Sequence, residues 1–315
     1  MRVVFFGTPE FAVPSLGALL GEGFDVLAVV TQPDRPRGRS RSSLAPPPVK
    51  LAADADGVPV LQPERPTDPD FLAELRALAP DIGVVVAYGH ILRPELLALP
   101  ARGMVNVHPS LLPALRGAAP VEWAILRGLE KTGVTIMQME AGMDSGPIIH
   151  QIPHRIDPEV SGGELSDHLA EMGAQALIEA LAMLEQDALR PVPQDHSRAT
   201  FAPKLTRDLA RLDWTKPADV VARFTRGLDP RPGAWTELRD EGRGTGDAVE
   251  VKLFGGRVVE GRGEPGEVLR ADEELVIAAV RDAVAIAEVQ PAGRDRMPAG
   301  DWVRGRRLAV GQRFA

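Results

Sequence analysis

The sequence predicts an α/β fold with a doubly wound, mostly parallel sheet, followed by a small β-barrel domain. In the first half of the chain, short runs of β-branched and aromatic residues alternate with runs of helical periodicity, which is the pattern of parallel strands joined by helices. Beyond residue 206, short apolar runs are separated by glycine-rich turns, at a spacing typical of small barrels.

The first half contains four strand-like runs and three helix-like runs. We expect strands over residues 2–6, 26–30, 82–87 and 104–108, and helices over 14–20, 71–78 and 166–185. A glycine follows the first strand, as in dinucleotide-binding folds, but residues 7–12 (GTPEFA) lack the second and third glycines of that fingerprint. We therefore expect no dinucleotide site there.

The second half begins after a proline-rich, polar stretch, which is the best candidate for a linker. Beyond it we expect a helix over 218–226 and strands over 234–238, 249–254, 266–269, 275–279 and 283–289. The predicted organisation is a sheet domain over residues 1–189, a linker over 190–206 and a barrel domain over 207–315.

Composition limits the classes of function. The 315 residues include no cysteine, so disulfides, thiolate nucleophiles and sulfur-bound metal are excluded. The N-terminal apolar run is too short for a signal peptide and no run approaches a membrane span, so we expect a soluble, cytoplasmic protein. The net charge of −8 opposes bulk electrostatic binding of nucleic acid, but residues 200–315 carry 20 basic and 19 acidic residues. Any contact with RNA should therefore be local.

Polar side chains lie at the end of the strand predicted over 104–108. Side chains alternate along a strand, so Asn106 and His108 face the same way, and Pro109 ends the strand. Ligands bind at the carboxyl ends of strands in open α/β sheets. Asp144, in the glycine-flanked segment 142–146 (GMDSG), can reach these side chains from a second loop.

Taken singly, Asn106, His108 and Asp144 are more often structural residues, but they belong to a longer pattern. Its parts are residues 106–113 (NVHPSLLP), 116–120 (RGAAP), 132–139 (TGVTIMQM) and 142–146 (GMDSG). This pattern resembles the folate-dependent formyltransferases, and most of all the branch that acts on methionyl initiator tRNA. Residues 201–205 (FAPKL), 212–214 (LDW) and 228–235 (LDPRPGAW) are similar to that branch's linker and second domain, so the resemblance covers essentially the whole chain.

The resemblance implies transfer of a formyl group from the co-substrate 10-formyltetrahydrofolate to the α-amino group of methionyl initiator tRNA, with no metal. It implies that Asn106, His108 and Asp144 are catalytic and that the C-terminal barrel is OB-like and binds tRNA. We expect a monomer, although the sequence does not determine the oligomeric state. Asn106 can donate its amide to the oxyanion. His108, as imidazolium, can add a second donor or protonate the leaving nitrogen, and Asp144 can accept the amine's proton. Which residue moves the proton stays open.

The resemblance also implies a slot for the pterin ring of folate, formed largely by backbone groups and apolar side chains. The residues assigned to folate are Val86, Ala87, Tyr88, Gly89, Ile91, Leu92, Ser110, Leu111, Leu112, Pro113 and Glu140. For Ile91 and Leu92, core packing is an equally good interpretation. His90 departs from the family, which more often has an apolar residue at that position.

The loop over residues 34–48 matches an insertion that approaches the acceptor end of the tRNA in this branch. Arg37, Arg39 and Arg41 lie in its basic part and are the predicted tRNA-binding residues, although a solvated loop is the simpler interpretation of such a run. Leu115 occupies a position that is often aromatic in the family, which weakens any expectation of stacking there.

Two other functions compete with this one. The first is a formyltransferase of the same fold that acts on a small amine, such as glycinamide ribonucleotide or an amino sugar, although the glycinamide enzymes lack a barrel. The second is a non-catalytic RNA-binding protein, which the intact Asn106, His108 and Asp144 oppose. His150 and His154 are spaced as a helical metal pair would be, but Pro153 lies between them, so we expect them to be structural.

Overall fold

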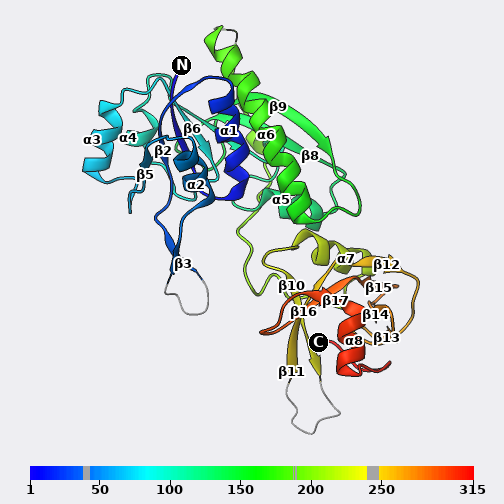
Figure 1. Ribbon diagram of the computed structural model, residues 1–315. Coiled ribbons are helices and arrows are strands. Elements are labelled where there is room, and N and C mark those ends of the chain that lie inside the picture. The colour runs from blue at the N-terminus through cyan, green and yellow to red at the C-terminus, as the bar shows by residue number, and fades with distance from the viewer. Residues whose placement is uncertain (38–42, 187, 189, 240–247) are drawn as a thin grey trace. The chain divides into compact units, whose positions relative to one another are not determined.

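The computed structural model describes residues 1–37, 43–186, 188, 190–239 and 248–315 (Figure 1). These residues form two compact units. The first unit contains Met1–Pro120, Thr132–Arg155 and Ser166–Ala202, and the second contains Val121–Lys131, Ile156–Leu165 and Pro203–Ala315. Within the described part of the chain, no helix has the length and apolar character needed to cross a membrane.

The first unit is built on a seven-stranded sheet with the order β5-β2-β1-β6-β7-β8-β9. Its strands are β1 (Arg2–Gly7), β2 (Asp25–Val30), β5 (Val60–Leu61), β6 (Ile82–Val86), β7 (Met104–His108), β8 (Lys131–Gln138) and β9 (Ile148–Arg155). The first five in spatial order are parallel, and β8 runs antiparallel to β7. The predicted doubly wound, mostly parallel sheet is therefore confirmed.

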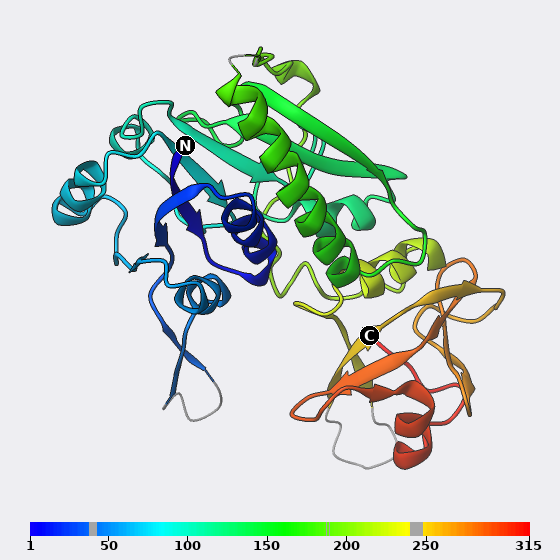
Figure 2. The same ribbon diagram turned by 45° about the horizontal axis from the view of Figure 1, so that its top comes forward.

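Helices cover both faces of this sheet. They are α1 (Val13–Gly21), α2 (Pro48–Ala55), α3 (Pro69–Ala77), α4 (Pro94–Leu97) and α6 (Gly162–Glu185), with the 3-10 turns η1 (Glu10–Ala12) and η2 (His196–Arg198). The helix α5 (Pro120–Leu126) precedes β8 in the chain, but all its residues after Pro120 belong to the second unit. Figure 2 shows α1 and the long α6 in front of the strands. Burial on both faces explains the continuous apolar runs in β1 and β6.

One face of the sheet packs against α3 and α4. Phe71 and Leu75 of α3 and Leu96 of α4 share a core cluster with Val4, Phe6 and Met104 of the strands. The helix α3 begins where the sequence favours it, because the Asp68 carboxylate accepts a hydrogen bond from Asp70 N at 3.0 Å and a proline follows Asp68.

A short antiparallel ribbon interrupts the first unit between β2 and α2. Its strands are β3 (Arg35–Arg37) and β4 (Ser43–Ala45), which pair in register from Arg35 opposite Ala45 to Arg37 opposite Ser43. The ribbon projects from the body of the unit in both views (Figures 1 and 2). Part of the segment expected as a loop over 34–48 therefore forms a two-stranded ribbon.

The second unit is the expected small β domain, and consists of two four-stranded antiparallel sheets. One has the order β10-β11-β16-β17 and the other β12-β15-β14-β13. The elements are α7 (Ala218–Gly227), β10 (Ala234–Arg239), β11 (Ala248–Phe254), β12 (Arg257–Val259), β13 (Val268–Ala271), β14 (Leu275–Ala278), β15 (Ala283–Ile286), β16 (Glu288–Pro291), β17 (Met297–Pro298) and α8 (Ala299–Arg306). Trp214, Trp235, Trp302 and Phe314 belong to its core.

The prediction of a single strand over 283–289 is wrong. The structure divides it into β15 and β16, which belong to different sheets. The chain leaves one sheet and enters the other at Ala287, whose amide donates to Phe254 O at 3.3 Å. A continuous apolar run cannot reveal such a change of sheet, because both strands face the same core.

Candidate active site

The end of β7 holds the first two residues of the predicted site. The strand pairs with β6 on one side and β8 on the other. Its side chains therefore point alternately to the two faces of the sheet. Val107 is buried next to Gly173 of α6, which puts Asn106 and His108 on the opposite face. His108 is 4% exposed and Asn106 is half-buried.

The hydrogen bond of His108 fixes the position of its proton. Its Nε2 lies 3.0 Å from Leu115 O, and a carbonyl oxygen can only accept, so Nε2 carries the hydrogen. The lone pair of the neutral ring is then on Nδ1. Leu115 is itself buried and has a left-handed φ of 58°, and its carbonyl lies at the Nε2 edge of the imidazole.

Asp144 comes from the loop between β8 and β9 and meets His108 at Nδ1. The Asp144 Oδ2 atom lies 3.8 Å from His108 Nδ1 and accepts a hydrogen bond from Gly117 N at 2.8 Å. The distance of 3.8 Å is too long for a hydrogen bond, but close enough for the carboxylate to act on the charge of the ring. The structure therefore brings together the Asp144 carboxylate and the His108 imidazole, which come from a loop and a strand that are separate in the sequence.

The Asn106 side chain has no hydrogen-bond partner among the residues that the structure describes. An amide normally bonds to protein or water when half-buried. The free amide on the same face as His108 can therefore donate to an oxygen of a bound substrate.

Burial lowers the pKa of His108, and the positive charge of Arg116 lowers it further. The charge of Asp144 and the hydrogen bond to Leu115 O raise it but do not overcome the burial. The ring is therefore neutral at pH 7, and the imidazolium expected from the sequence is not the resting state. A neutral ring with its lone pair on Nδ1 accepts a proton before it can donate one.

Only part of the segment assigned to folate presents side chains to solvent. Ile91 is 89% exposed, so the core-packing interpretation is wrong for this residue. Leu92 and Tyr88 are buried in the core, where Tyr88 packs edge-on against Phe6 and burial raises the pKa of Tyr88 to about 12. The segment can therefore contact a ligand through Ile91 and through backbone groups, but not through the Tyr88 ring.

The remaining residues of this segment have side chains that are small or buried, apart from His90. Val86 is fully buried, and Ala87 and Gly89 have φ values of 48° and 84°. A Cβ atom at Gly89 would meet the flexible end of the Gln32 side chain, and the positive φ favours glycine whatever the space. His90 is exposed, and its ring lies 5.3 Å from that of Tyr88.

The second group assigned to folate lies in the turn after β7 and in the loop before β9. Ser110 and Leu112 are buried, and Ser110 Oγ donates to Ala114 O at 2.6 Å. Leu111 and Pro113 are half-buried, and Glu140 is exposed. The Ser110 hydroxyl and the Leu112 side chain therefore stabilise the turn, which leaves Leu111, Pro113 and Glu140 to meet a ligand.

The predicted tRNA-binding arginines are described only in part. Arg37 belongs to β3, and nothing of its side chain is described, while Arg39 and Arg41 lie outside the described residues. The base of the ribbon is tied to the sheet unit by Lys50, whose Nζ donates to Asp34 Oδ1 at 2.9 Å and to Gln62 Oε1 at 2.8 Å.

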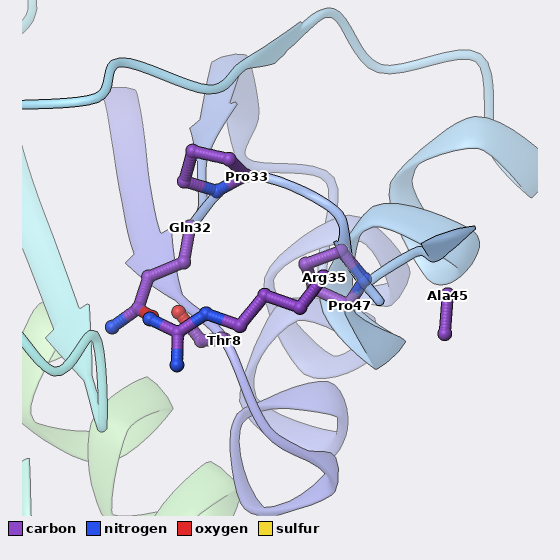
Figure 3. A pocket seen from close by; sticks show the side chains of 6 residues that line it. All are labelled: Thr8, Gln32, Pro33, Arg35, Ala45 and Pro47. Carbon is purple, nitrogen blue, oxygen red and sulfur yellow. The ribbon is translucent and has the colours of Figure 1, made fainter. Parts of the chain in front are cut away.

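A cavity of about 150 Å³ opens at the carboxyl ends of β1 and β2. Figure 3 shows the lining residues, which are Thr8, Gln32, Pro33, Arg35, Ala45 and Pro47. The Arg35 side chain extends to the Gln32 amide and donates to its Oε1 atom. Thr8 Oγ1 and Gln32 Nε2 both donate to Tyr88 O at 3.0 Å.

The order of the strands makes this edge the switch point of the sheet. The chain passes from β1 to β2 in one direction and continues with β6 and β7 on the other side of β1. Open α/β sheets bind ligands outside such a point. Thr8 follows β1 and Tyr88 follows β6. The cavity, the segment over 86–92 that was assigned to folate and the end of β7 therefore lie along the carboxyl edge of the parallel strands.

The two histidines with metal-like spacing are not arranged as metal ligands. His150 and His154 lie on β9, where His150 Nε2 is 2.8 Å from Glu179 Oε2 and the His154 ring lies 4.4 Å from that of His168. No cluster of three or more potential metal ligands occurs among the described residues.

The sequence analysis missed Arg116 and Gln194. Both are 6% exposed and are joined by hydrogen bonds, and Gln194 also bonds to the backbone of the Asp144 loop. Arg116 lay within the quoted RGAAP motif, which could have identified it. Gln194 lies in the stretch expected to be a linker, where composition gives no sign of burial.

Comparison with known proteins agrees with this geometry. The formyl transferase family profile matches residues 1–181, and the profile of the formyl transferase C-terminal domain matches residues 204–307. Methionyl-tRNA formyltransferase of Roseiflexus sp. is 47% identical over 318 residues, covering 100% of this chain and 95% of that protein. The enzyme of the same name from Synechococcus sp. is 46% identical, covering 100% of this chain and 98% of that protein.

Solved structures share the fold at lower identity. HypX from Aquifex aeolicus in complex with tetrahydrofolic acid has a TM-score of 0.68 at 20% identity, covering 98% of this chain and 48% of HypX. The N-formyltransferase from Helicobacter canadensis has a TM-score of 0.67 at 16% identity, covering 92% of this chain and 99% of that enzyme. Because the sequence relatives match along the whole length and both family profiles are present, the chain belongs to the methionyl-tRNA formyltransferase family.

Proposed function

We propose that the chain transfers the formyl group of 10-formyltetrahydrofolate to the α-amino group of methionyl initiator tRNA. The observation that carries this proposal is the 3.8 Å approach of Asp144 Oδ2 to His108 Nδ1 on the face of β7 that also holds the free Asn106 amide. Attack of an amine on an acyl carbon needs a donor for the oxyanion and an acceptor for the proton. These three side chains supply both.

Asn106 acts on the oxygen and His108 on the proton. The Asn106 amide donates to the formyl oxygen as it becomes negative, and such a donor contributes about 3 kcal/mol where its removal has been measured. An α-amino group has a pKa of about 8, so a useful fraction is already neutral. As its nitrogen bonds to the formyl carbon, neutral His108 accepts the proton at Nδ1, and Asp144 stabilises the imidazolium.

The same ring then completes the transfer. When the bond between the formyl carbon and N10 of folate breaks, His108 returns the proton to N10, so the folate leaves neutral at that nitrogen and the acceptor retains the formyl group. The hydrogen bond from Nε2 to Leu115 O keeps the second ring nitrogen out of the reaction and holds Nδ1 toward the substrate.

We assign the folate slot to the backbone of residues 86–92 and to Ile91, Leu111, Pro113 and Glu140. Ile91 is 89% exposed, so its side chain is free to meet a ligand at this edge of the sheet. Ser110, Leu112 and Tyr88 serve this slot by shaping its backbone. We assign the acceptor side to the cavity of Figure 3 and to the ribbon that carries Arg37, Arg39 and Arg41.

For the whole chain, we propose that residues 1–189 form the catalytic domain, that 190–206 connect it to the rest and that 207–315 form a tRNA-binding domain. We propose a cytoplasmic monomer. A patchy charge distribution on a chain of net charge −8 fits an RNA substrate held by a few local contacts.

The test is formylation of charged initiator tRNA by the full chain, with and without 10-formyltetrahydrofolate. Glycinamide ribonucleotide and an amino-sugar nucleotide serve as alternative acceptors. We expect formyl-methionyl-tRNA only when the folate is present, and no product with the small amines. Formylation of a small amine in preference to the tRNA would overturn the assignment of the acceptor, and binding of tRNA without any transfer would overturn the assignment of an enzyme.

A further inference from the structure

The segment after α6 returns to the active site instead of leaving it. Residues 192–202 pair with two other segments of the first unit. Val192 exchanges two backbone hydrogen bonds of 2.8 Å with Ile148, just after the Asp144 loop. Farther along, Arg116 N donates to Thr200 O at 2.9 Å and Ala202 N donates to Arg116 O at 2.7 Å. Gln194 lies between these two attachments.

All the hydrogen-bonding capacity of the Gln194 amide is used inside the protein. Its Oε1 atom accepts from Arg116 Nη2 at 2.6 Å and from Arg116 Nε at 3.1 Å, and its Nε2 atom donates to Asp144 O at 2.9 Å and to Gly146 O at 2.7 Å. The buried guanidinium can only donate and the two carbonyls can only accept, so the amide has one possible orientation.

Asp144 needs such support because of its backbone. Its φ is 48°, a left-handed conformation that is unfavourable for a residue other than glycine and persists only where the surroundings enforce it. Gly117 N holds the carboxylate at 2.8 Å and Gln194 holds the carbonyl at 2.9 Å. Arg116 and Gly117 are adjacent, so one short segment orients the Gln194 amide and also binds the Asp144 carboxylate.

We propose that Gln194 is a positioning residue for formyl transfer, which holds the Asp144 loop so that the carboxylate faces His108 Nδ1, and that Arg116 orients the Gln194 amide for this task. The inference rests on the proposed catalytic role of Asp144. It assigns a function in the reaction to a buried glutamine whose amide bonds only to the protein among the described residues.

The test uses the full chain with two substitutions of similar length. Gln194→Met removes all four hydrogen bonds, and Gln194→Glu keeps an acceptor for Arg116 but places a second acceptor against Asp144 O and Gly146 O. Gln175→Met is the matched control, since Gln175 is an exposed glutamine of α6 that bonds only to Glu179 Oε1 among the described residues.

We expect kcat to fall about 10- to 100-fold in both Gln194 variants, because a misplacement of about 1 Å is known to cost this much. The KM values for 10-formyltetrahydrofolate and for charged tRNA should stay within about twofold, since Gln194 is buried and its amide makes all four hydrogen bonds within the protein. The Gln175→Met control should retain the wild-type kcat. Melting temperatures, measured in parallel, set an assay temperature at which every variant is folded.

A double-mutant cycle with Asp144→Asn gives the decisive readout. If Gln194 acts through Asp144, then Gln194→Met should reduce kcat much less in the Asp144→Asn background than in the wild type. Equal reductions in both backgrounds, or a wild-type kcat in folded Gln194→Met, would overturn the proposal for Gln194. A wild-type kcat in Asp144→Asn would instead overturn the catalytic assignment itself, so the two failures are distinguishable.

Discussion

At the scale of single residues, burial determines how His108 works. The side chain is 4% exposed and makes its single described hydrogen bond through Nε2. Burial lowers the pKa of His108, so in the proposed mechanism the neutral ring reacts through Nδ1. Asp144, at 3.8 Å, does not hold the ring in place, because Leu115 O does. Its carboxylate instead favours the charged ring that exists during proton transfer.

The pH dependence of kcat should reveal this base. A base works only when deprotonated, so kcat should fall as the pH drops through the pKa of His108, which burial holds below its ordinary value of 6.5. Asp144→Asn removes a group that favours the charged ring, so the acid limb of the residual activity should move to still lower pH. The acceptor amine titrates alike in both proteins, so the difference between the two profiles reports His108. An acid limb that moves upward in Asp144→Asn would contradict this role.

At the scale of elements, α6 and β7 are joined by a close approach. A Cβ atom on Gly173 of α6 would lie 2.8 Å from Val107 Cγ1 of β7, and a valine side chain has little freedom to move aside. The glycine lets the helix lie against the strand whose other face carries Asn106 and His108. The packing of Gly173 against Val107 thus helps to fix the position of β7, whose opposite face carries Asn106 and His108.

Gly173→Ala should therefore destabilise the protein although it improves helix propensity. The overpacking costs about 1–3 kcal/mol, and the gain in the helix is about 1 kcal/mol, so we expect a net loss measured by urea unfolding. Adding Val107→Ala should remove the clash, so the double variant should lose less stability than the two single effects added together. Strict additivity would show that the two side chains do not compete for space.

The ribbon of β3 and β4 is the element that we expect to act on tRNA. Replacing Arg37, Arg39 and Arg41 together by alanine should lower kcat/KM for charged initiator tRNA and flatten its dependence on salt, because fewer counterions are released on binding. The affinity for 10-formyltetrahydrofolate, measured in parallel, should not change. An unchanged salt slope would mean that the ribbon is only a solvated surface, and an equal loss of folate affinity would place it in the folate slot.

The sequence predicted several strands that are continuous apolar runs, but it missed others, among them the buried strand β8, whose sequence KTGVTIMQ mixes polar and apolar residues. The strand of β7 was predicted with its observed bounds, because Met104, Val105 and Val107 are all buried. The strand β9 was missed, because its sequence IIHQIPHR is polar and contains a proline, which an edge strand tolerates. The three proposed catalytic residues were identified from a motif, whereas the hydrogen bonds of Gln194 depend on chain segments 50 and 78 residues away.

At the scale of the whole molecule, the two compact units do not divide the chain at one point. Residues Val121–Lys131 and Ile156–Leu165 belong to the second unit although they lie within the first family profile. Leu126 is buried in the core of the second unit, and Gly227 packs against Ile125. The part of the sequence that matches the first family profile therefore supplies part of the core of the second unit.

A chain that ends at residue 202 should accordingly be less stable than the full chain. It keeps the hydrogen bond between Ala202 N and Arg116 O, but it exposes Ile125 and Leu126, each of which contributes about 1.5–3 kcal/mol when fully buried. We expect a lower melting temperature, retained binding of folate where the fragment is folded, and poor activity on tRNA. A fragment as stable as the full chain and equally active on tRNA would contradict this organisation.

The central claim is that Asn106, His108 and Asp144 together perform formyl transfer to a tRNA-borne amine. Its most direct test is the single-turnover rate of formyl-methionyl-tRNA formation at saturating 10-formyltetrahydrofolate, for the wild type and for Asn106→Ala, His108→Ala and Asp144→Ala. Loss of an oxyanion donor or of a proton-transfer group is expected to slow the step by about 100-fold or more in each case, with circular dichroism confirming that the variants are folded. Wild-type rates in all three folded variants would show that the chemistry lies elsewhere.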